Sequence, residues 1–133
     1  ARGVQFALLG TSEQVGGERR ALLQILREVL RCAADAATRG ARTPLVRVEV
    51  QGGAKGVTVL ISDNGPPRAP AETTPDSDAG VLELLSTRSG ALRISLEPVP
   101  AGVGLALPAS RLGGVTVQLT MPRAGAAAVR DAA

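Results

Sequence analysis

The longest regular pattern in this chain is a run of apolar residues at helical spacing. From position 18 to position 38, apolar side chains recur at i, i+4, i+7, i+11 and i+14, which places them on one face of a helix. These residues are Leu22, Leu26, Val29, Ala33 and Ala36. Gly40 follows directly and is expected to end the helix. The pattern therefore predicts one amphipathic helix over residues 18–38.

Strands are predicted where apolar and polar residues alternate and valine or isoleucine is frequent. The segments with this pattern are 3–10, 45–51, 56–65, 91–99 and 115–122. A glycine-rich turn, GGAKG, separates the second segment from the third. Because residues 66–79 are poor in apolar side chains, they predict a flexible loop, and residues 79–88 predict a short helix.

The glycine-bounded segment 101–114 shows neither the helical spacing of apolar residues nor the alternation that is typical of a strand. Pro108 excludes a long regular helix there, because proline lacks the backbone N–H and clashes with the preceding turn. At most a short helix over residues 108–112 is expected. The alanine-rich residues 123–133 are expected to form a frayed, disordered tail.

The order of these elements indicates an α/β fold with a long helix after the first strand. Helices packed on one face of a mixed sheet form a two-layer α/β sandwich. The chain has 133 residues, so a single domain over residues 1–133 is expected. A domain of this size buries roughly two-thirds of its unfolded surface. Because the chain begins at Ala1 and not at methionine, we expect a fragment of a longer protein.

Composition narrows the possible functions. Phe6 is the only aromatic residue, so the core must consist of aliphatic side chains, and bases of single-stranded nucleic acid cannot be bound by stacking. The net charge of +3 comes from scattered residues, so no nucleic-acid partner is expected. The chain contains no histidine, which excludes a histidine nucleophile, base or metal ligand within it. A single cysteine and no apolar run of membrane-spanning length favour a cytoplasmic domain without membrane contact.

Four segments, taken in order, resemble the ATP-binding domains of histidine kinases, which belong to the GHKL ATPases. GERRALLQILREVLRCAADA resembles the N-box helix, and VTVLISDNGPP resembles the first Gly-rich box. VLELLSTRSG is similar to the segment before the nucleotide lid, and GVGLAL is similar to the second Gly-rich box. The resemblance covers residues 17–122 and implies a Bergerat-type ATP-binding fold.

The predicted helix carries a second, polar stripe beside its apolar face. Glu28, Cys32, Asp35 and Arg39 lie at i, i+4, i+7 and i+11. The resemblance implies that Glu28 acts on the attacking group and that the stripe contacts the nucleotide. Without the resemblance, the same residues are an ordinary charged helix face.

The resemblance also implies a magnesium ion, which the family holds through an asparagine at the position of Cys32. A thiol is a poor replacement, because magnesium prefers hard oxygen ligands. Three outcomes are open. Asp35 supplies the oxygen, or water and the ATP phosphates hold the metal together with Glu28, or the metal site is lost and Cys32 is a small core residue.

Asp63 ends a predicted strand and is followed by Asn64 and Gly65. The resemblance implies that the Asp63 carboxylate accepts a hydrogen bond from the adenine amino group, while Gly65 allows the base to approach closely. The alternative is a simple turn, since Asp-Asn-Gly also favours turns. The family's usual second glycine is replaced by Pro67.

The second half of the chain offers further nucleotide-binding candidates. By resemblance, Gly102 and Gly104 would cradle the phosphates, Thr87 and Arg88 would approach them, and Thr116 belongs to the same binding set. A strand turn and a surface arginine are the alternatives. In this chain, residues 91–101 are inserted before the second Gly-rich box. Only one strand follows Gly113-Gly114, where the family has two. The extra strand predicted over residues 91–99 is therefore expected to take the place of the missing strand in the sheet.

Taken together, these features predict the catalytic ATP-binding domain of a two-component sensor histidine kinase. Its cofactors would be ATP and Mg²⁺, and it would transfer the γ-phosphoryl group to a histidine on its own, separate dimerisation domain, from which a response regulator would receive it. Two alternatives stay open: a non-catalytic docking module that keeps the fold, and an anti-sigma-type serine kinase.

Overall fold

The computed structural model describes residues 3–10, 15–16, 19–40, 42–53, 56–66, 81 and 103–122. Within these residues, one long helix, α1 (Arg19–Gly40), follows the first strand. The strands are β1 (Gln5–Gly10), β2 (Leu45–Gly52), β3 (Val57–Asp63), β4 (Gly104–Ala106) and β5 (Thr116–Met121). The expected strand over residues 91–99 and most of the expected helix over 79–88 lie outside the described residues.

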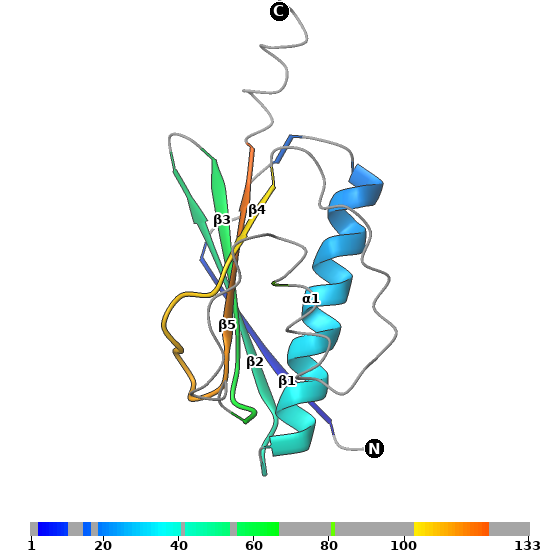
Figure 1. The fold of residues 1–133 in the computed structure, drawn as a ribbon, viewed down its shortest axis with the longest axis vertical. Helices are drawn as coiled ribbons and strands as arrows, with labels where there is room; N and C mark the ends of the chain where they lie inside the picture. Colours follow the sequence, from blue (N-terminus) through cyan, green and yellow to red (C-terminus); the bar gives the residue numbers. More distant parts are fainter. Residues whose placement is uncertain are drawn as a thin grey trace, which may run out of the picture.

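The described strands form one mixed sheet in the order β1-β2-β3-β5-β4. β1 runs parallel to β2, and the other pairs are antiparallel. Because parallel neighbours need a long connection, α1 serves as the crossover between β1 and β2. Figure 1 shows α1 packed along one face of the sheet. The α/β prediction with a mixed sheet is confirmed.

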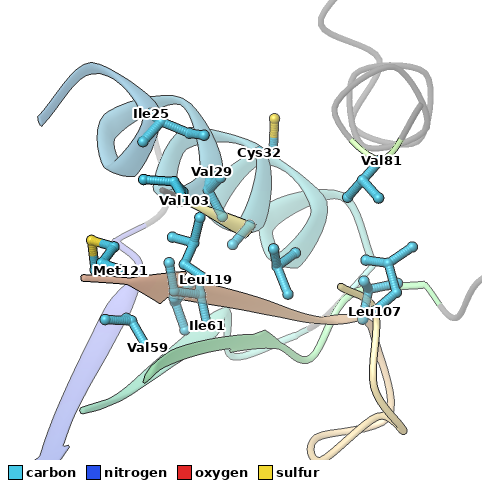
Figure 2. Close-up of a cluster of buried hydrophobic side chains, with 14 of the residues drawn as sticks. Ile25, Val29, Cys32, Val59, Ile61, Val81, Val103, Leu107, Leu119 and Met121 are labelled. Carbon is cyan, nitrogen blue, oxygen red and sulfur yellow. The ribbon is translucent and has the colours of Figure 1, made fainter. Parts of the chain in front are cut away.

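The strand register decides which side chains face α1. Val46 pairs with Asp63, and Ile61 pairs with Val117, so these side chains share one face of the sheet. The apolar residues on that face are buried with those of α1 in a single cluster, part of which is drawn in Figure 2. The fully buried members include Val29, Val46, Ile61 and Leu119.

The apolar face of α1 is wider than the pattern predicted. Leu22, Val29, Ala33 and Ala36 are buried as expected, whereas Leu26 is only partly buried. Three further residues of the helix are also buried: Ile25, Cys32 and Ala37. The helix ends at Gly40, as predicted, and Arg39 lies in its last turn, where a positive charge favours the helix dipole.

The prediction of a short helix over residues 108–112 is wrong. No helix forms there, and the short strand β4 precedes it. Pro108 removes a backbone donor, and Gly113 adopts a positive φ of 91°, which breaks any regular repeat. The middle of the segment 107–114 lies on the side of the sheet away from α1 (Figure 1), where Arg111 Nη1 lies 3.7 Å from Glu49 Oε1, whereas Leu107 at its start belongs to the core cluster.

Within the described residues, no helix is both long and apolar enough to cross a membrane.

The packing of the core predicts a large difference in stability between alanine variants of two leucines. Leu119 is 0% exposed and Leu23 is 51% exposed. Replacing Leu119 by alanine leaves a cavity between sheet and helix, so we expect the free energy of unfolding to fall by about 2–5 kcal/mol. The matched control, Leu23→Ala, should change it by about 0.5 kcal/mol or less. Urea denaturation of both variants measures the difference, and equal losses would contradict the assigned core.

Candidate functional site

Asp63 is held rigidly at the end of β3. Its backbone N–H donates to the Val115 carbonyl oxygen at 3.0 Å, and its own carbonyl accepts from the Gly114 N–H at 3.2 Å. Its side-chain Oδ1 accepts from the Gly65 N–H at 2.9 Å, which closes the turn that follows the strand. Asp63 is 3% exposed and lies on the α1 face of the sheet. A carboxylate is therefore fixed between sheet and helix.

Two glycines let the backbone approach Asp63 and α1 more closely than any other residue would allow. A Cβ on Gly65 would overlap the backbone carbonyl of Ala36 in α1. A Cβ on Gly114 would overlap the Asp63 carboxylate and its carbonyl oxygen. The turn after β3 thus packs directly on the C-terminal half of α1.

Asn64 is a structural residue that sequence reasoning treated only as part of a turn. Its side-chain Oδ1 accepts from the Leu45 N–H at 2.9 Å, and its Nδ2 donates to the Thr43 carbonyl at 2.9 Å. Both bonds tie the end of β3 to the start of β2. Asn64 therefore stabilises the turn that carries Asp63 and Gly65.

One flank of α1 carries the polar stripe predicted from the sequence. A helix turns about 100° per residue, so Glu28, Cys32, Asp35 and Arg39 fall within a narrow sector beside the buried face. Glu28 and Asp35 are both partly exposed, and Arg39 is exposed. Cys32 is buried at 3% exposure. Figure 2 shows its sulfur on the side of α1 turned away from the sheet.

Arg31 links the two acidic residues of this flank, and sequence reasoning missed it. Its Nη2 lies 3.2 Å from Glu28 Oε2, and its Nη1 lies 3.3 Å from Asp35 Oδ2. The hydrogen bond to Glu28 raises the pKa of the Arg31 guanidinium. The signal was available in the sequence, since Arg31 stands three residues after Glu28 and four before Asp35.

Solved structures similar to this chain include several from histidine kinases. The mycobacterial sensor histidine kinase MprB matches with a TM-score of 0.59 and 21% identity, over 90% of this chain and 82% of that chain. The ATP-binding domain of PrrB from Mycobacterium tuberculosis matches with a TM-score of 0.58 and 18% identity, over 90% and 80%. The catalytic domain of histidine kinase ThkA matches with a TM-score of 0.56 and 15% identity, over 90% and 80%.

The chain has the fold of a histidine kinase ATP-binding domain. No family model matches the sequence, and no curated protein matches it. At these identities the likeness concerns the fold, and the roles of individual residues have to be argued from their geometry.

Within this kinase-domain fold, the residues on the α1 flank do not fit a magnesium site as they stand. Glu28 and Asp35 are both engaged by the Arg31 guanidinium, and the side chain between them on the stripe is the soft, buried thiol of Cys32. In the part of the chain that the structure describes, no group of three or more His, Cys, Asp or Glu side chains could hold a metal ion. The alternative in which Asp35 alone replaces the family's asparagine therefore gains no support from the geometry.

The structure does not bring Thr116 to the face of Asp63. Thr116 pairs with Ser62, the neighbour of Asp63, and successive residues of a strand point to opposite faces. Its hydroxyl oxygen lies 2.9 Å from Ser62 Oγ and accepts from the Arg111 N–H at 3.2 Å. Thr116 is 1% exposed, so its hydroxyl serves the packing of the face opposite α1.

Gly104 lies far from Asp63 along the sheet. It opens β4 and pairs with Thr120, four residues along β5 from Thr116, a separation of about 13 Å. A Cβ at Gly104 would meet nothing within 4 Å, so the backbone geometry there does not require glycine. The other candidates of this region lie outside the described residues: Pro67, Thr87, Arg88 and Gly102.

The close approach at Gly114 generates a prediction with an internal control. We expect Gly114→Ala to lower the free energy of unfolding by about 1–3 kcal/mol, because the added methyl group displaces the Asp63 side chain. Gly104→Ala should stay within about 0.5 kcal/mol of the parent chain, since its site is open. Thermal and urea unfolding of both variants provides the measurement. A destabilised Gly104→Ala together with an unchanged Gly114→Ala would contradict the close packing assigned to Gly114 and the open space assigned to Gly104.

Proposed function

We propose that this chain is the ATP-binding catalytic domain of a sensor histidine kinase. The observation that carries the proposal is the buried Asp63 carboxylate, fixed by Gly65 and Gly114 between β3 and α1. The similar structures include the ATP-binding domain of PrrB and the catalytic domain of the histidine kinase ThkA, which supports the same activity here.

In this proposal, Asp63 binds the adenine base. A carboxylate accepts several hydrogen bonds at once, so the bond from the Gly65 N–H is compatible with a second donor such as the adenine amino group. The missing side chain at Gly65 favours close approach of a flat base to the turn. A buried carboxylate in such a position would favour adenine over bases that present a carbonyl oxygen there. The carboxylate oxygen and the carbonyl oxygen are both acceptors, so no hydrogen bond could form between them.

The phosphates would lie along the polar flank of α1. Gly65 contacts the helix at Ala36, and the helix rises 1.5 Å per residue. Cys32 and Glu28 therefore lie about 6 Å and about 12 Å from that level along the axis. This spacing supports a nucleotide whose base is at Asp63 and whose terminal phosphate approaches Glu28.

The proposed reaction moves the γ-phosphoryl group from ATP to a histidine on the protein's own dimerisation domain. The bond between the γ-phosphorus and the bridging oxygen breaks, a phosphorus–nitrogen bond forms, and ADP leaves. The Glu28 carboxylate would accept a hydrogen bond from the N–H of the attacking imidazole and so orient that ring. Catalysis of this kind rests on positioning and on stabilisation of charge. The phosphoryl group would then pass to a response regulator, and the cytoplasm is the compartment we propose.

Magnesium enters this proposal only as an ion carried by the nucleotide phosphates and water. The described residues provide no set of ligands for it, for the reasons given above. We therefore assign no step to a metal held by Glu28 or Asp35.

A second candidate function is a nucleotide-binding or docking module that no longer transfers phosphate. The ion pairs of Arg31 with Glu28 and Asp35 favour it, because they occupy the carboxylates that catalysis would use. The buried Cys32 in place of a metal ligand favours it as well. Measurement of phosphotransfer separates this candidate from the first. An acid-stable phosphoserine product, in place of an acid-labile phosphohistidine, would select the serine-kinase alternative.

The adenine role of Asp63 is tested by Asp63→Asn. The asparagine oxygen can still accept from the Gly65 N–H, but the amide then presents its NH2 group to the adenine amino group. If the amide is turned around, its oxygen faces the base as a neutral acceptor in place of a charged one. A hydrogen bond to a charged group contributes about 1.5–3 kcal/mol, so we expect the Kd for ATP to rise by about ten- to a hundredfold. Calorimetric titration with ATP measures it, with the unfolding midpoint as the control for an intact fold. An unchanged Kd in a folded variant would exclude Asp63 from base recognition.

The catalytic role of Glu28 is tested by Glu28→Ala. We expect phosphotransfer to be abolished while much of the ATP affinity remains, because Glu28 would act on the attacking group and not on the base. The assay follows label from γ-phosphate-labelled ATP into the phosphoacceptor domain of the full-length protein. Arg27→Ala, an exposed change on the same helix, should leave transfer intact. Full activity of Glu28→Ala would remove the assigned role.

A further inference from the structure

The polar flank of α1 carries charges of alternating sign. Glu28, Arg31, Asp35 and Arg39 follow one another at spacings of three or four residues, so each lies beside the next on the helix surface. Their formal charges sum to zero. Arg31 occupies the middle position and contacts both carboxylates, at 3.2 Å and 3.3 Å.

This arrangement opposes a divalent cation and suits an anion. A magnesium ion needs several free hard oxygens, and here it would have to displace the Arg31 guanidinium from both carboxylates. An incoming phosphate meets the reverse situation, because it competes with Glu28 and Asp35 for a guanidinium that is already in place. The planar fork of arginine matches phosphate oxygens through two parallel hydrogen bonds.

The existing ion pairs are of the kind that exchanges readily. The side chains of Arg31, Glu28 and Asp35 are 37%, 27% and 43% exposed, and ion pairs at such exposed positions are weak. When the guanidinium turns to a phosphate, both carboxylates can be solvated by water. Arg31 stands five residues before Ala36, about 7.5 Å along the axis from the level of Gly65, which is on the path assigned to the phosphates.

We propose that Arg31 binds the nucleotide phosphates in this chain, and that nucleotide affinity does not depend on a divalent cation ligated by Glu28 and Asp35. This inference rests on the nucleotide site proposed above and specifies how that site neutralises the phosphate charge. Asp35 then acts as a competitor of the phosphates for Arg31 and not as a metal ligand.

The two roles of Asp35 predict opposite effects of Asp35→Asn. If Asp35 competes for Arg31 and repels the phosphates, its neutralisation strengthens ATP binding, by about two- to fivefold for an exposed ion pair. If Asp35 holds magnesium, the same change weakens ATP binding, and only when magnesium is present. The sign of the change therefore distinguishes the roles without any assay of catalysis.

The experiment is a calorimetric titration with ATP, once with excess magnesium and once with EDTA. For the parent chain we expect Kd values that agree within about twofold. Asp35→Asn should bind more tightly in both conditions, and Arg31→Gln should bind about tenfold more weakly in both. Arg27→Gln is the control, since Arg27 is an exposed arginine of the same helix, one turn before Arg31 and about 40° farther around the helix from the stripe of Glu28, Asp35 and Arg39; it should leave Kd unchanged.

Three results would overturn the inference. Binding of the parent chain that weakens tenfold or more in EDTA would show a required metal, while leaving the proposed ATP-binding function in place. Equal losses of ATP affinity in Arg31→Gln and Arg27→Gln would show that Arg31 acts only through the overall positive charge of the surface. Absence of ATP binding in both conditions would overturn the proposed function itself, and the inference with it.

Discussion

The candidate site depends on the direct contact between the turn after β3 and the backbone of α1. Gly65 lies against the Ala36 carbonyl, where a Cβ would not fit, and Gly114 lies equally close to Asp63. These contacts fix the distance between the end of the sheet and the C-terminal half of the helix. Because Asp63 is bonded to Gly65, Gly114 and Val115, its carboxylate has one position relative to both layers. A helix placed farther from the sheet would move the polar flank of α1 away from this carboxylate.

The helix itself has two sides with different tasks. One side, with Val29 and Ala36, is buried against the sheet and supplies most of the helix contribution to the core. A second carries the alternating charges that end in Arg39. Cys32 lies at the border between these two sides, which explains why a small thiol is buried there although its position belongs to the polar stripe.

The chemistry of that border sets this chain apart from what the family resemblance implies. Magnesium binding depends on hard oxygen ligands, and the chain offers a thiol at Cys32 and two carboxylates already paired with Arg31. The turn after β3, by contrast, holds the Asp63 carboxylate, Gly65 and Gly114 in a closely packed, hydrogen-bonded arrangement. Under the proposed function, recognition of the adenine base and stabilisation of the phosphate charge would rest on different elements, the turn after β3 and the polar flank of α1.

Local pattern in the sequence determined the elements whose signal is strong and short-range. The period of apolar residues predicted α1 and its end at Gly40, and alternation predicted β2 and β3, with Asp63 at the end of a strand. Tertiary structure alone decided what depends on register and on neighbours distant in the chain. Pairing with Ser62 turned Thr116 to the face opposite Asp63, because one residue along a strand reverses the direction of the side chain. Tertiary packing likewise made Cys32 a buried member of the core cluster, although its position belongs to the polar stripe of the helix.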